Sequence, residues 1–214
     1  MADYHPDIVL LQESPGRKTV QKLGKDLFGS EAGVVRGVDA SLIARGSVTP
    51  AALPASLQSA FVQARVRLTS GTEVEVFSMR LVPAVFRLDL WSPGRWREQS
   101  ENRRGRRDQL RAVANRFGSI PDGVPVILGG DFNAPQSDAV FRLLRPRLHD
   151  TFLEGGRGWG NTIVNDIPCL MIDQVWASGA FLAASVVARR TRNSDHRMVI
   201  CDLTIASPGR EPGK

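Results

Sequence analysis

The sequence predicts an α/β fold in which a β-sheet is covered by helices, and two observations indicate this class. Residues 8–11 (IVLL) and 124–128 (VPVIL) are short apolar runs of the kind that form strands buried inside a covered sheet. Residues 96–117 instead have helical periodicity. Short buried strands combined with a long helix are typical of an α/β domain.

The N-terminal half contains further signals of both kinds. A weakly amphipathic segment at residues 19–28 predicts a helix after the first strand, and residues 34–42 predict the next strand. Residues 61–68 (FVQARVRL) alternate apolar and polar side chains. We expect them to pair with residues 72–82 across a Ser-Gly turn as a β-hairpin.

The C-terminal half adds a helix and three strands. Ser137 is a suitable N-cap for a helix over residues 137–144. The strands are expected at residues 170–177, 183–189 and 198–205. No repeat or linker divides the chain, so we expect a single domain over residues 1–206 and a flexible tail at residues 207–214.

Size and charge limit the classes of protein. The chain has 214 residues, of which 42% are hydrophobic and 23% charged, and these values exclude a disordered or collagen-like protein. The net charge is +6, and all but four of the 28 basic residues are arginine. This charge favours anionic partners such as nucleic acids, phosphate esters or acidic lipid headgroups, because arginine suits bidentate phosphate contacts.

The cysteines, the apolar runs and the N-terminus indicate in which cellular compartment the protein is expected. Cys169 and Cys201 lie among apolar residues without metal-ligand spacing, which predicts buried structural thiols. No apolar run approaches the roughly 18 residues of a transmembrane helix, and residues 1–7 lack a signal-peptide pattern. We therefore expect the chain as given to be cytoplasmic.

Polar residues gather where the apolar strands end, which is where sites assemble in covered sheets. A single carboxylate at a strand end is usually a turn or cap residue. The prediction of a functional site therefore rests on the joint occurrence of four polar clusters. Scattered carboxylates with few histidines suit Mg²⁺, whereas zinc favours more histidine or cysteine. The clusters are Gln12-Glu13, Asp131-Phe132-Asn133, Asp173 and Asp195-His196.

His196 has polar neighbours on both sides, which is unusual for a histidine packed in a core. A histidine on a surface loop is the alternative. Asp173, on a different predicted strand, is the candidate to accept its ring N–H, which would fix the tautomer and favour the imidazolium.

In order and spacing, these clusters resemble the endonuclease/exonuclease/phosphatase superfamily. The resemblance covers residues 7–204 and rests on the segments LQES, GGDFN, IDQVW and SDHR. It implies a DNase-I-like α+β fold, a four-layer sandwich of two mixed β-sheets flanked by helices. It also implies hydrolysis of phosphoester bonds with Mg²⁺, or alternatively Mn²⁺, as the cofactor.

The resemblance assigns roles around the metal. Glu13 would be the principal metal ligand, and Asp195 would support the metal. Asp131 would orient or deprotonate the attacking water, and Asn133 would hold a phosphate oxygen or the nucleophile.

Other roles concern the phosphate. His196, oriented by Asp173, would bind or protonate the phosphate, and Arg197 could add a further contact. These parts meet a physical need, because a phosphodiester anion repels hydroxide and its hydrolysis requires a cation, a positioned water and a donor for the developing charge.

The chain departs from the family pattern in two places. Family members begin with a strand that carries a metal-binding asparagine before the Gln-Glu strand, and this chain starts too late to contain it. We therefore expect the fold to lack this first strand. If an upstream segment is missing, it could have held a membrane anchor or an export signal.

The second departure is Arg80, which stands where the family usually has a histidine or a tyrosine. Arginine can bind the substrate phosphate but stays protonated, so it cannot act as a general acid or base near neutral pH. Because a positioned proton-transfer group contributes roughly 10² to 10⁴ in rate, activity could be reduced. Alternatively, Arg80 is a surface residue at a strand end.

The sequence thus predicts a metal-dependent hydrolase of phosphoester bonds, acting on a phosphodiester. Nucleic acid is slightly favoured over phospholipid or inositol phosphate because of the basic charge. The alternative is a weakened or inactive family member that binds phosphate or nucleic acid. No protein partner is indicated, and we expect a monomer.

Aromatic and arginine side chains leave two interpretations open. The arginines of residues 95–111 form either a solvated helix face or an edge that contacts phosphate. Trp159, among glycines, could stack on a base, a sugar or a lipid headgroup, or anchor its loop. Trp91 and Trp96 allow the same readings, with core packing favoured.

Overall fold

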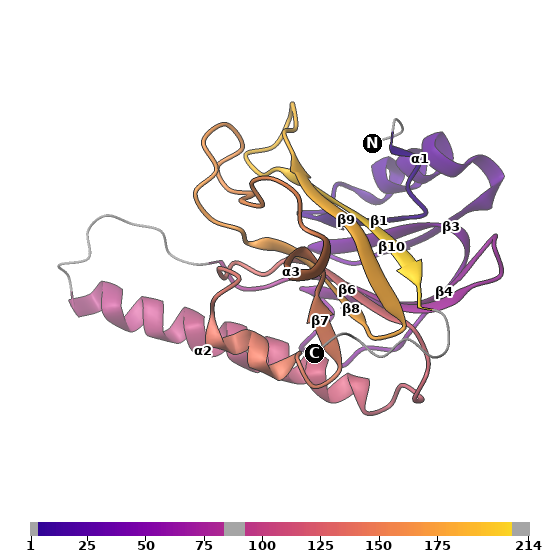
Figure 1. Ribbon diagram of the computed structural model, residues 1–214. Helices are drawn as coiled ribbons and strands as arrows, with labels where there is room; N and C mark the ends of the chain where they lie inside the picture. Colours follow the sequence, from indigo (N-terminus) through magenta and orange to yellow (C-terminus); the bar gives the residue numbers. More distant parts are fainter. Residues whose placement is uncertain (1–3, 84–92, 207–214) are drawn as a thin grey trace.

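A computed structural model describes residues 4–83 and 93–206 (Figure 1). Its elements, with η for 3-10 helices, are β1 (Ile8–Gln12), α1 (Arg17–Phe28), η2 (Gly29–Glu31), β2 (Ala32–Arg36), β3 (Ala40–Pro50), β4 (Phe61–Leu68), β5 (Glu73–Arg80), α2 (Pro93–Phe117), β6 (Val126–Asp131), η3 (Ala139–Leu143), β7 (Leu148–Asp150), α3 (Thr151–Gly155), β8 (Asp173–Ser178), β9 (Phe181–Arg189) and β10 (Met198–Ile205).

The strands form two sheets. An eight-stranded sheet has the order β1-β3-β4-β5-β6-β8-β7, with β2 also paired to β3, and β9 and β10 form a second sheet. Within the large sheet β5 and β6 are parallel, and the other pairs are antiparallel. The long strand β3 changes partners at Gly46, where φ is 140° and a Cβ would lie 2.1 Å from the Arg67 carbonyl oxygen. This glycine lets the sheet curl.

Three apolar clusters separate four layers. One cluster joins α1 to the strands β1 to β3 and contains Val20, Phe28 and Ile43. The second lies between these strands, β9 and the inner face of the remaining sheet. The third joins the outer face of that sheet to α2 and η3, with Leu110 and Phe141 among its residues. The predicted α+β architecture of sheets flanked by helices is confirmed.

Most predicted elements are present, and the β4–β5 hairpin closes with the Leu68 N–H donating to the Thr72 carbonyl at 2.9 Å. The single strand predicted at residues 34–42 is wrong, because Gly37 donates to the Ala40 carbonyl at 2.8 Å in a turn between β2 and β3. The helix predicted at residues 137–144 is the shorter η3.

The cap predicted for that helix is also wrong. Asp138, not Ser137, caps η3, since its Oδ1 accepts from the Val140 N–H at 3.0 Å. A carboxylate is as good a cap as a hydroxyl, so residue type alone could not choose between the two neighbours.

Two predictions of burial are wrong. Cys169 is exposed, in the loop between α3 and β8, and Cys201 is half-buried on β10. Trp96 has 64% of its surface exposed, because it belongs to the part of α2 that lies before the helix reaches the core. Trp159 is exposed as well. Trp91 lies outside the described residues.

Among the described strands, β1, β2, β7, β9 and β10 each pair with one other strand. β1 pairs with β3 alone, and β10 pairs with β9 alone, so neither has a strand on its other side in residues 4–83 and 93–206. The tail predicted at residues 207–214 lies outside the described part. Among the described helices, none has the length and apolar character needed to cross a membrane.

Candidate active site

The centre of the site is Asp131, the last residue of β6. The apolar residues Val126 and Leu128 bury the strand, and Gly130 lets it approach β5 closely. At Gly130 φ is 147°, and a Cβ would lie 1.9 Å from the Met79 carbonyl oxygen, so only glycine fits. The close parallel pairing brings Asp131 opposite Arg80.

The Asp131 carboxylate is held by the turn that follows the strand. Oδ1 accepts from the Asn133 backbone N–H, and Oδ2 accepts from the Asn133 amide Nδ2, both at 2.9 Å. Asn133 has φ of 48°, a conformation that asparagine tolerates better than most residues. Its Nδ2 also donates to the Leu81 carbonyl at 2.9 Å, which fixes the turn to the end of β5.

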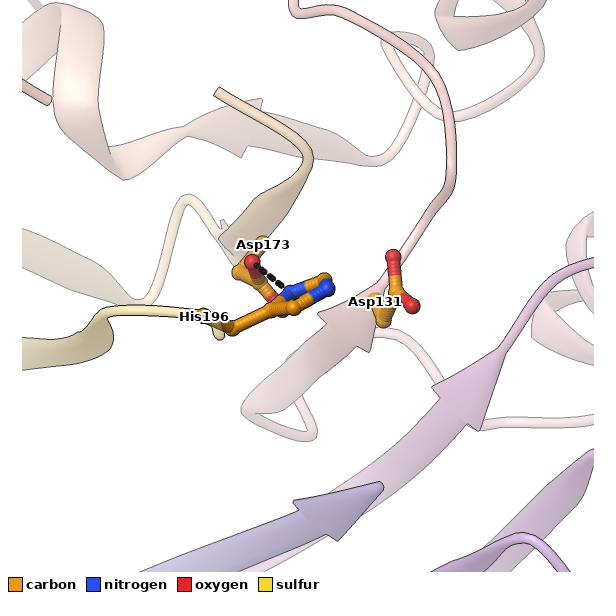
Figure 2. A group of neighbouring side chains, drawn as sticks. All are labelled: Asp131, Asp173 and His196. Atoms are coloured by element: carbon orange, nitrogen blue, oxygen red, sulfur yellow. Dashed lines mark hydrogen bonds and ion pairs between the residues drawn. The ribbon is translucent and has the colours of Figure 1, made fainter. Parts of the chain in front are cut away.

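Asp173 and His196 complete a three-residue cluster (Figure 2). Asp173 begins β8 and pairs in register with Asp131 on the neighbouring strand. The His196 Nδ1 lies 2.8 Å from the Asp173 Oδ2, so the expected partner of this histidine is confirmed. Thr162 positions Asp173, since its hydroxyl accepts from the backbone N–H groups of Ile172 and Asp173 at 3.2 and 3.1 Å.

The surroundings of the cluster raise the pKa values of two of its members, His196 and Asp131. The hydrogen bond to Asp173 raises the pKa of His196 from 6.5 to about 9 against the opposing effect of burial, so the imidazole is protonated at neutral pH. Burial, followed by the negative charge of Asp173, raises the pKa of Asp131 from 3.8 to about 6. Asp131 can therefore take up a proton close to neutral pH, which an ordinary aspartate cannot.

Arg80 joins this cluster to Glu13. Its Nη2 donates to the Glu13 Oε1 at 2.5 Å, and its Nε lies 3.8 Å from the Asp131 Oδ2. The Nε is buried and has no hydrogen-bond partner. Glu13 itself is exposed and has φ of 50°, directly after the end of β1. Arg80 is therefore part of the site and not merely a surface residue.

Comparison with known proteins places the chain in a family. The sequence matches the model of the Endonuclease/Exonuclease/phosphatase family over residues 1–196. The chain belongs to this family. No match was found among the curated proteins.

Solved structures of the family share the fold. A mannosyl-6-phosphatase from Bacteroides thetaiotaomicron is 15% identical, with a TM-score of 0.70 over 95% of this chain and 88% of that chain. A humanized D. rerio TDP2 is 21% identical, with a TM-score of 0.67 over 95% and 87%. D. rerio TDP2 complexed with a single-strand DNA product is 18% identical, with a TM-score of 0.65 over 95% and 88%.

The donor set fits the divalent cation that the family implies. One ligand atom from each of Asp131, Asp173 and His196 lies within 4.8 Å of the others. Carboxylate oxygens suit Mg²⁺ or Mn²⁺, while a protonated imidazole cannot ligate a metal. The carboxylates that would hold an ion are thus Asp131 and Asp173, with His196 left as a donor, whereas Glu13 is paired with Arg80.

The remaining predicted residues lie further out. Asp195 is exposed and outside the three-residue cluster, and its carboxylate acts by raising the pKa of His196. The Arg197 Nε donates to the Asn165 carbonyl at 2.8 Å. The metal role of Asp195 and the phosphate role of Arg197 stay predictions.

Asn165 is a site residue that sequence reasoning missed. It is 8% exposed, and its amide donates to the Thr191 carbonyl at 2.7 Å and accepts from the Thr191 N–H at 3.0 Å. Its carbonyl also accepts from Arg197. These bonds hold the loop that carries His196, and no local motif marks an asparagine that acts across 26 residues.

Proposed function

We propose that this chain is a divalent-metal-dependent phosphoesterase that hydrolyses phosphodiesters, with nucleic acid as the favoured substrate. The cluster of Asp131, Asp173 and His196 carries the proposal, because it combines a protonated imidazole with a carboxylate of near-neutral pKa. Family membership supports the reaction class, since members of this superfamily hydrolyse phosphoester bonds.

The residues divide the chemistry. The His196 Nδ1–H donates a hydrogen bond to Asp173, which leaves the Nε2–H free to donate to a phosphate oxygen as charge develops. Asp131 is ready to orient the attacking water and accept its proton. A bound divalent cation would neutralise phosphate oxygens by Lewis acidity. Arg80, with an unpartnered buried Nε, can donate to the same anion.

The substrate class follows from charge. The chain carries a net charge of +6, which favours a polyanion over an isolated phosphate group. The similar structures include a TDP2 complexed with a single-strand DNA product and a mannosyl-6-phosphatase, so the fold alone does not decide the substrate.

One observation favours a second function, that of a phosphate- or nucleic-acid-binding protein without turnover. The Arg80 guanidinium pairs with Glu13 and approaches Asp131, so it competes with a metal ion for the same carboxylates. A site whose acidic groups are neutralised by its own arginine binds a divalent cation less tightly.

The deciding experiment compares the unmodified chain with Arg80→His, with Asp131→Ala as the background. Hydrolysis of an aryl phosphodiester, plasmid DNA and a phospholipid is measured with Mg²⁺, with Mn²⁺ and with a chelator. We expect metal-dependent turnover above the Asp131→Ala level, with plasmid DNA cleaved in preference to phospholipid. If the unmodified chain shows none and Arg80→His does, the binding function is correct.

A further inference from the structure

The first half of α2 is not part of the core. Among the described side chains of this helix, the buried ones are Arg106, Leu110, Val113 and Phe117, which share one face and begin only at the fourth turn. Before Arg106 the described side chains are exposed or half-buried. Figure 1 shows α2 lying along the sheets with its first turns projecting past the strands.

On both sides of Arg106, α2 carries three exposed cations, which we call the arginine stripe and define as Arg103, Arg104 and Arg107. The three side chains are exposed, and none has an ion pair or hydrogen bond within the described residues. Spacings of three and four residues place Arg103, Arg104 and Arg107 on adjacent turns of one flank. Trp96, exposed as well, precedes Arg103 by two turns on the same flank.

The stripe is fixed beside the active site. The Gln109 Oε1 accepts from the Val82 N–H at 3.0 Å, and the Arg106 Nη1 donates to the Val82 carbonyl at 3.4 Å. Val82 follows Leu81, whose carbonyl accepts from Asn133 of the site. The middle of α2 is thus anchored two residues beyond Arg80, and the arginine stripe lies within about one turn of the anchored Arg106.

We propose that the arginine stripe binds the phosphate backbone of a nucleic-acid strand, with Trp96 stacking on a base, and leads that strand to the active site. The inference rests on the proposed function for its link to the site. Three unpaired arginines, of which Arg103 and Arg107 lie about 6 Å apart along the helix, match a ligand that carries several phosphate charges better than they match a lone phosphate. An exposed tryptophan supplies the stacking surface that single strands use.

The composition of this helix argues against a membrane as the ligand. Helices that lie in a membrane surface bury a continuous apolar face in the lipid. In residues 94–105 of α2, Trp96 is the one large apolar side chain, and the others are arginine, glutamate, glutamine, asparagine, serine or glycine. The favoured occupant is therefore a nucleic acid.

The test measures binding of a fluorescent single-stranded oligonucleotide by anisotropy at several salt concentrations, with a chelator present so that nothing is cleaved. The stripe variant is Arg103→Gln/Arg104→Gln/Arg107→Gln. The control variant, Lys18→Gln/Lys25→Gln/Arg36→Gln, removes the same charge from exposed positions on α1 and β2. Thermal unfolding checks that both variants fold.

We expect the slope of log affinity against log salt to fall by about 2 in the stripe variant, since each lost phosphate contact on a single strand contributes about 0.7. The control variant should keep the slope of the unmodified chain. Equal losses in both variants, or an unchanged slope in the stripe variant, would overturn the proposal, as would tighter binding to anionic phosphatidylserine vesicles than to the oligonucleotide. Because binding is read without turnover, failure of the proposed hydrolysis is a separate result.

Discussion

The pair formed by His196 and Asp173 leads to a quantitative prediction. Asp173→Asn removes the largest cause of the raised pKa of His196, which is about 9 instead of 6.5. The difference of about 2.5 units corresponds to about 3 kcal/mol at 1.36 kcal/mol per unit. The side chains are 25% and 15% exposed, so solvent screens the pair little. We expect the pKa of His196 in Asp173→Asn to fall by about two units.

The assay is an NMR titration of the His196 ring protons between pH 5 and 10. Asp195→Asn is the matched control, because this exposed carboxylate is the smallest of the causes that raise the pKa. Its His196 should titrate close to that of the unmodified protein. A histidine that titrates near 6.5 in the unmodified protein, or an equal shift in the two variants, would refute the reasoning.

The same pair makes stability depend on pH. A histidine with a raised pKa stabilises the fold fully below about pH 6.5, and this stabilisation is lost as pH rises through about 9. The free energy of unfolding should therefore fall by about 3 kcal/mol over this window, and denaturant titrations of Asp173→Asn should show a flatter profile. A profile that does not change on substitution would mean that the ion pair does not form.

Three further predictions concern Asp131, Arg80 and the cysteines. Asp131→Asn should raise the melting temperature at pH 8, because ionising this buried carboxyl costs the fold free energy above its pKa of about 6, and should reduce hydrolysis by 10² or more. Arg80→His should bind Mn²⁺ more tightly in calorimetry, because Glu13 is released; unchanged affinity contradicts the competition. Cys169 should react rapidly with an aromatic disulfide at pH 8, and Cys201 slowly, because burial raises the pKa of Cys201 to about 11.

The fold was predictable where local pattern and tertiary packing agree. The alternation of residues 61–68 predicted β4 with the same bounds, although only its second half alternates, since residues 61–64 are buried on both faces. The pattern failed at residues 34–42, where the single predicted strand includes the turn signal of Gly37 and Asp39 between β2 and β3. It failed again at Trp96, because helical periodicity does not tell how far along α2 the core extends.

The site was predictable to the extent that strand ends carry it. Asp131 ends β6 and Asp173 begins the antiparallel neighbour β8, so the two residues lie opposite each other at one edge of the sheet. Because both are carboxylates, their residue type alone indicated a metal-binding or acid–base role. The sequence could not predict that Thr162 and Asn165 position the site residues. Their hydrogen bonds fix backbone groups of loops that come together only when the chain folds. Polar residues in loops have no periodicity from which such a role could be inferred.

Charge balance explains why Arg80 decides between the two functions. Glu13, Asp131 and Asp173 bring three carboxylates towards one region, and the protonated His196 and Arg80 offset two of those charges without any metal. A divalent cation therefore gains less from this site than from one with a neutral residue at position 80, because it must first separate Arg80 from Glu13. A substrate phosphate lowers that cost, since it offers the released guanidinium a new anionic partner. Turnover thus depends on whether phosphate and metal together outweigh the Arg80–Glu13 pair.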